Sequence, residues 1–103
     1  MFNKRILVIE DTELMQRLIC DILKNEGYEV YSAYSGEEGL DMVTAVKPDL
    51  IILDIVMSGI SGFDVCRILR SDESNILIPI IMLTAQDSED DKLVGLEMGA
   101  DDY

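Results

Sequence analysis

The chain has 103 residues, which fits one domain, and its apolar fraction of 49% is typical of a globular protein. Its formal net charge of −13 argues against nucleic-acid binding by this domain, because phosphate backbones would repel it. No apolar run is long enough to span a membrane, and Cys20 and Cys66 fit a reduced core, so we expect a cytoplasmic protein.

Short apolar runs alternate with stretches of helical period. In chain order these are a strand at Ile6–Ile9, a stripe of Leu14, Leu18 and Ile22 with Met15 and Ile19, a strand at Glu29–Tyr34, a stripe of Leu40, Val43 and Val46, a strand at Leu50–Leu53, a stripe of Phe63, Cys66 and Leu69, a strand at Ile80–Leu83, and a stripe of Leu93 and Leu96. Continuously apolar strands are typical of parallel sheets buried on both faces. The order predicts an open α/β sheet with right-handed crossovers.

Local chemistry marks the predicted helix ends. Three pairs have the spacing of a capping box at a helix start: Ser35 with Glu38, Ser61 with Asp64, and Ser88 with Asp91. The run Lys47-Pro48-Asp49 is expected to end one helix before the next strand.

Acidic and hydroxyl side chains follow three of the predicted strands: Glu10 and Asp11, Asp54, and Thr84. Ligands of open α/β sheets bind beyond the carboxyl ends of the strands, so we expect these side chains to converge there. Clustered carboxylates repel one another unless a cation lies among them, and oxygen ligands favour Mg²⁺. The alternative is that a single acid caps a helix, as Asp11 could do for a helix beginning near Thr12.

Taken together, these residues resemble the receiver domains of two-component response regulators, the CheY-like family. The matching segments run from Lys4 to Tyr103: Ile6-Leu7-Val8-Ile9-Glu10-Asp11, Pro48-Asp49-Leu50-Ile51-Ile52-Leu53-Asp54-Ile55-Val56-Met57, Gly62, Leu83-Thr84-Ala85, and Gly99-Ala100-Asp101-Asp102-Tyr103. The resemblance implies a single receiver domain over residues 1–103, with a flavodoxin-like doubly wound parallel sheet of strand order 2-1-3-4-5.

The resemblance also implies a role for each site residue. Asp54 is expected to accept a phosphoryl group from a sensor histidine kinase or phosphotransfer protein. Mg²⁺ is expected to be bound by four groups: Asp11, Asp54, the backbone carbonyl of Val56, and Glu10, the last mainly through water. Thr84 should donate a hydrogen bond to the phosphoryl group, and Tyr103 should change rotamer in the active state. Such a domain is a signalling phosphoacceptor that catalyses its own phosphorylation and dephosphorylation.

The sequence departs from the family pattern at two places. Ser58 stands where the family usually has proline, four residues after the acceptor. The chain also ends at Tyr103, before the family's phosphoryl-binding lysine and fifth helix, and no lysine occupies that lysine's position. We therefore expect a fold truncated within the fifth βα unit, with an open edge through which the protein could associate.

Other functions remain as alternatives. A receiver-like module that signals by binding, without phosphorylation, stays open because the lysine is missing. A haloacid-dehalogenase-like phosphatase would need a second Asp two residues after the nucleophile, where Val56 stands. A flavodoxin-like cofactor binder would need a phosphate-cradling loop at Glu10-Asp11, where the two carboxylates would repel the phosphate.

Overall fold

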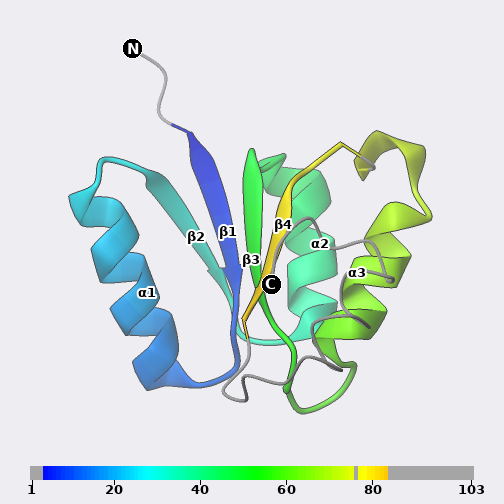
Figure 1. Cartoon of the computed structure of the whole chain (residues 1–103), viewed down its shortest axis with the longest axis horizontal. Helices are drawn as coiled ribbons and strands as arrows, with labels where there is room; N and C mark the ends of the chain where they lie inside the picture. Colours follow the sequence, from blue (N-terminus) through cyan, green and yellow to red (C-terminus); the bar gives the residue numbers. More distant parts are fainter. Residues whose placement is uncertain (1–3, 76, 84–103) are drawn as a thin grey trace.

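A computed structural model describes residues 4–75 and 77–83 of the chain. The elements are β1 (Arg5–Ile9), α1 (Glu13–Asn25), β2 (Glu29–Ala33), α2 (Gly36–Val46), β3 (Leu50–Asp54), α3 (Gly62–Arg70), a 3₁₀ turn (Glu73–Asn75) and β4 (Ile80–Leu83). The four strands form one parallel sheet in the order β2-β1-β3-β4 (Figure 1). This confirms the flavodoxin-like fold. The expected fifth strand, the helix near Leu93 and the Ser88 cap lie outside the described residues.

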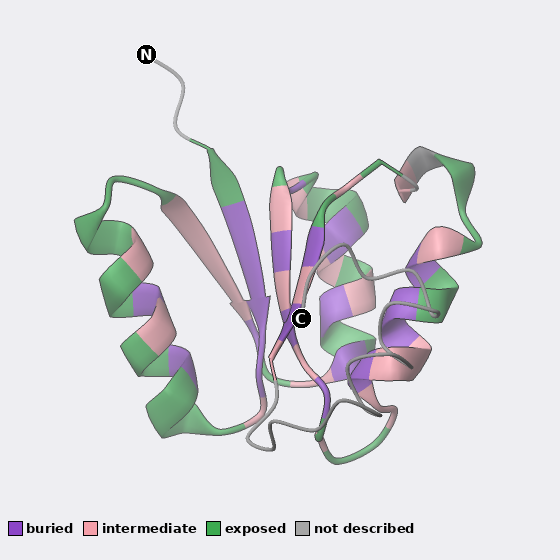
Figure 2. Ribbon diagram, viewed as in Figure 1, coloured by how far each residue is buried: buried purple, intermediate pink, exposed green. Residues whose placement is uncertain are grey.

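Helices cover both faces of the sheet, with α1 on one side and α2 and α3 on the other (Figure 1). Strand β1 lies in the middle and sends alternate side chains to the two faces, as a strand's period of two requires. Leu7 and Ile9 belong to the larger core beneath α2 and α3, whereas Ile6 and Val8 belong to a smaller core beneath α1. The burial of β1 stands out in Figure 2.

The predicted apolar stripe of helix α1 indicates its packed face only in part, because Ile19 packs against the smaller core. Leu14, Leu18 and Ile22 are 74%, 53% and 56% exposed, whereas Gln16 and Cys20 are buried against the sheet. A displacement of two residues turns the direction of a side chain by about 200° around a helix, so these three exposed residues lie nearly opposite Gln16 and Cys20. None of the described helices has the length and apolar character needed to cross a membrane.

The predicted helix ends are confirmed where the structure describes them. The Ser35 hydroxyl accepts a hydrogen bond from Glu38 N at 3.1 Å, and the Ser61 hydroxyl accepts one from Asp64 N at 3.2 Å. Lys47 ends α2 in the left-handed conformation, with φ 54°. The chain then turns into β3, as the Lys47-Pro48-Asp49 run predicted.

Replacing Lys47 with glycine should stabilise the protein by about 0.5–1 kcal/mol, because glycine adopts a positive φ without a steric cost. Lys24→Gly is the matched control. Lys24 lies in the last turn of α1, so this variant should lose about 1 kcal/mol of stability. Urea unfolding of both variants measures the difference. A lower unfolding midpoint for Lys47→Gly than for the wild type would contradict the prediction.

Candidate acidic site at the carboxyl edge of the sheet

The parallel register of the strands brings three carboxylates together. Ile9, the last residue of β1, is paired with Leu53, one residue before the end of β3. Glu10 and Asp11 therefore leave the sheet beside Asp54, at its carboxyl edge. One carboxylate oxygen from each of Glu10, Asp11 and Asp54 lies within 4.8 Å of the other two. We call these three residues the acidic cluster. Its oxygen donors fit a hard divalent cation such as Mg²⁺.

Glu10 is the most buried member of the acidic cluster, with an exposed fraction of 5%. Burial raises the pKa of its carboxyl from 4.5 to about 7, and the neighbouring Asp54 and Asp11 add to the rise. The Thr12 N–H opposes this rise, since it donates to Glu10 Oε2 at 3.2 Å. In the absence of a cation, the proton on Glu10 relieves part of the repulsion in the cluster.

Asp11 does not cap helix α1. The N-cap residue is Thr12, whose side chain makes no capping hydrogen bond. Asp11 Oδ2 instead accepts a hydrogen bond from Ser58 N at 3.2 Å, across 47 residues of sequence. The helix-cap alternative is therefore wrong for this residue. The departure at Ser58 also has a structural consequence, because a proline there would have no N–H to donate.

The carboxylate of Glu37, which is not part of the acidic cluster, holds the same loop between β3 and α3. Glu37 Oε1, in the first turn of α2, accepts a hydrogen bond from Ile60 N at 3.2 Å. Gly59 lies between the two held residues and has φ 84°, a conformation that glycine adopts without strain. The loop is thus tied to the acidic cluster at Ser58 and to α2 at Ile60. No sequence signal indicated this role of Glu37, since acidic residues are ordinary in a helix's first turn.

Gly62 allows helix α3 to begin close to the backbone of Asp54. A Cβ at Gly62 would collide with the carbonyl oxygen of Asp54 and lie 2.8 Å from Ile55 Cα. Gly62 N also donates to the Ile55 carbonyl at 2.9 Å. The spacing of eight residues between Asp54 and Gly62 therefore has a steric cause: the backbone that follows Asp54 leaves no room for a side chain.

The remaining predicted site residues divide into two groups. Val56 lies in the loop after β3 with 75% of its surface exposed, so its side chain is not packed within the site. Thr84 and Tyr103 lie outside the described residues. Leu83, which precedes Thr84, pairs with Asp54, and its carbonyl accepts from Ile55 N at 3.1 Å.

Comparison with known proteins identifies the family. The family model of the response regulator receiver domain matches residues 6–103. The chain belongs to this family. It is 46% identical over 101 residues to the alkaline phosphatase synthesis transcriptional regulatory protein PhoP of Bacillus subtilis (strain 168), covering 98% of this chain and 41% of PhoP. The chain thus spans less than half the length of that relative.

Solved structures of receivers superpose closely on this chain. A response regulator of Chloroflexus aurantiacus J-10-fl, described as putative, is 35% identical, with a TM-score of 0.95 over 99% of this chain and 84% of its own. The BeF3-activated N-terminal receiver domain of Klebsiella pneumoniae RstA is 34% identical, with a TM-score of 0.90 over 97% of this chain and 83% of its own. This chain is therefore a receiver domain of the kind found in the response regulators of two-component systems.

The stability of the metal-free receiver should rise as the pH falls from about 8 to about 5. The pKa of Glu10 is about 7 in the folded protein against an ordinary value of 4.5, so the folded protein binds more protons than the unfolded chain between these values. The stabilisation is complete below the lower value and is lost as the pH rises through the higher one. Thermal melting in EDTA measures it.

Glu10→Gln is the control for this prediction. This variant keeps nearly the whole net charge of −13. The repulsion among the other acidic groups, which also changes with pH, is therefore nearly the same in both proteins. Its melting temperature should change less with pH than that of the wild type. Equal pH dependence in the two proteins would show that Glu10 does not carry the effect.

Proposed function

We propose that Asp54 is the phosphoryl acceptor of this receiver and that Mg²⁺ binds beside it. The ion would be held by Asp11, Asp54, the Val56 backbone carbonyl and, through water, Glu10. One observation carries the proposal: three carboxylate oxygens lie within 4.8 Å of one another at the carboxyl edge of a receiver-family sheet. Such a cluster is unfavourable without a cation or a proton.

The proposed reaction is a transfer from the phosphohistidine of a histidine kinase or phosphotransfer protein. A carboxylate oxygen of Asp54 forms the new P–O bond, the P–N bond breaks, and its electron pair returns to the imidazole nitrogen. Bound Mg²⁺ would neutralise the charge on the phosphoryl oxygens. Asp54 is half-buried, so a donor in solution can reach it. We further propose that Thr84 donates to the phosphoryl group and that Tyr103 responds to it.

The described lysines lie away from the acidic cluster. Lys4 precedes β1, Lys47 precedes β3, and Lys24 is in the last turn of α1, all toward the amino edge of the sheet. The described part of the chain therefore brings no lysine to Asp54. By similarity to PhoP, whose name describes a transcriptional regulatory protein, we propose that phosphorylation switches an output in the cytoplasm.

Acetyl phosphate should label Asp54 alone, in a reaction that requires Mg²⁺. Asp54→Asn should lose the label completely and stay folded, because the two side chains are nearly isosteric and the amide is a poor nucleophile. Asp41→Asn, on the exposed side of α2, should keep it. Mass spectrometry of the labelled protein makes the assignment. A phosphoryl group found on Ser58, Ser61 or Thr84 would overturn it, and an unlabelled wild type would favour a module that works by binding alone.

Asp11→Asn should weaken Mg²⁺ binding by at least about tenfold, because one full negative charge beside the ion is lost. The Asp41→Asn variant, which loses the same charge on α2, should bind Mg²⁺ as the wild type does. Titration followed by amide NMR signals gives both affinities. Equal affinity in Asp11→Asn and the wild type would mean that the ion binds elsewhere.

A further inference from the structure

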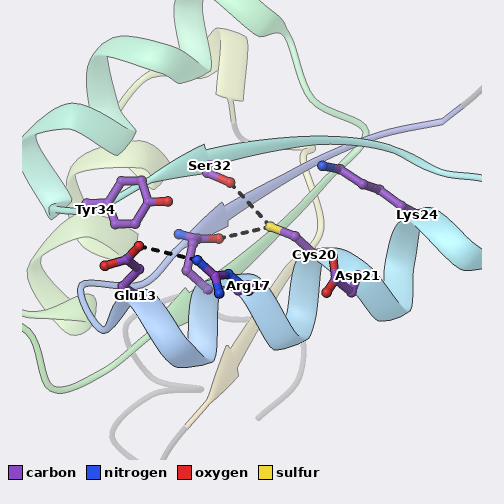
Figure 3. A pocket seen from close by; sticks show the side chains of 8 residues that line it. Glu13, Arg17, Cys20, Asp21, Lys24, Ser32 and Tyr34 are labelled. Atoms are coloured by element: carbon purple, nitrogen blue, oxygen red, sulfur yellow. Dashed lines mark hydrogen bonds and ion pairs between the residues drawn. The ribbon is translucent and has the colours of Figure 1, made fainter.

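A second buried polar residue lies beside the acidic cluster. Among the described residues, Glu10 and Gln16 are the buried polar ones, and Gln16 is only 1% exposed. Gln16 is on α1, where it borders a groove of about 180 Å³ between this helix and β2. Figure 3 shows that groove, with Arg17 and Lys24 from α1 facing Ser32 and Tyr34 from the β2 side. The buried amide needs hydrogen-bond partners within the protein, because water does not reach it.

The two N–H groups of the Gln16 amide are shared among three backbone carbonyls. Nε2 lies 2.9 Å from Ala33 O, 3.1 Å from Val8 O and 3.2 Å from Glu10 O. The amide oxygen faces the other way and accepts from Cys20 Sγ at 3.2 Å. Three acceptors on one side and a thiol donor on the other fix the orientation of the amide. Gln16 thus joins the ends of β1 and β2.

One of these carbonyls belongs to the acidic cluster itself. The Glu10 carbonyl is part of the peptide unit that links Glu10 to Asp11, and it lies one residue beyond the end of β1. The hydrogen bond from Gln16 to this carbonyl restrains the plane of the peptide unit, and with it the directions of the Glu10 and Asp11 side chains. The backbone N–H of Gln16 also donates to Thr12 O at 2.9 Å. This backbone bond belongs to the first turn of α1, whereas the side chain of Gln16 adds the contact with the Glu10 carbonyl.

We infer that Gln16 is a positioning residue that sets the Mg²⁺ affinity of the receiver by fixing the peptide between Glu10 and Asp11. The inference rests on the proposed metal site. Groups that orient metal ligands typically contribute about 10–100-fold to metal affinity, because free ligands must be ordered when the ion binds. The effect of removing Gln16 should therefore fall on binding of the ion and not on the acceptor Asp54.

The test replaces Gln16 with methionine, which has nearly the same shape but no N–H donor. Gln16→Met should bind Mg²⁺ about tenfold more weakly in an NMR titration. Labelling by acetyl phosphate should need correspondingly more Mg²⁺ but should reach the wild-type rate at saturation, since Asp54 is unchanged. Gln16→Asn, whose amide is one methylene shorter and cannot span the three carbonyls, should also bind more weakly. Sucrose is present throughout, because it favours the folded state of weakened variants.

Leu23→Ala is the matched control. Leu23 packs in the small core beneath α1, so its loss should lower the melting temperature as Gln16→Met does, yet leave the Mg²⁺ affinity within about twofold. Wild-type affinity in folded Gln16→Met or Gln16→Asn would overturn the inference, as would an equal loss of affinity in Leu23→Ala. Failure of the metal site itself looks different: the wild type would then bind no Mg²⁺, or would bind it as well after Asp11→Asn.

Discussion

Repulsion among three carboxylates is the constraint around which this receiver is built. The parallel pairing of β1 with β3 leaves Glu10 and Asp11 no position except beside Asp54. Backbone N–H groups compensate part of the charge: Thr12 donates to Glu10, and Ser58 donates to Asp11. Burial raises the pKa of Glu10, the most buried member, to about 7, so the remaining cost of the repulsion falls on this residue. The fold thus keeps three mutually repelling carboxylates together at the edge of the sheet where the proposed metal ion would bind.

Close packing of the backbone holds that arrangement in place. Gly62 brings the start of α3 against the Asp54 carbonyl, and Gln16 ties the Glu10 carbonyl to the end of β2. Both contacts act on main-chain atoms and leave the carboxylate oxygens open to a ligand. The two sides of the acidic cluster are therefore fixed by different helices, α1 on one face of the sheet and α3 on the other (Figure 1).

Much of this was predictable from the sequence, because strand period, capping serines and strand-end acids are local signals. Ser35 and Ser61 cap the helices that their spacing indicated, and Asp54 ends a buried strand. The side on which α1 packs was predictable only in part, because Ile19 of its apolar stripe packs against the core while Leu14, Leu18 and Ile22 face outward and the sheet takes Gln16 instead. The bond between Ser58 and Asp11 was equally hidden, since it depends on loop geometry across 47 residues.

Two hydrogen bonds hold the loop after β3, and only one of them involves the acidic cluster. The Glu37 anchor at Ile60 belongs to α2 and is independent of the acidic cluster, whereas the Ser58 anchor uses an oxygen of Asp11. A cation bound at this oxygen would share it with the Ser58 N–H, because a carboxylate oxygen has two lone pairs. The amide hydrogen of Ser58 is thus a built-in reporter of what Asp11 is bound to, readable by its rate of exchange with solvent.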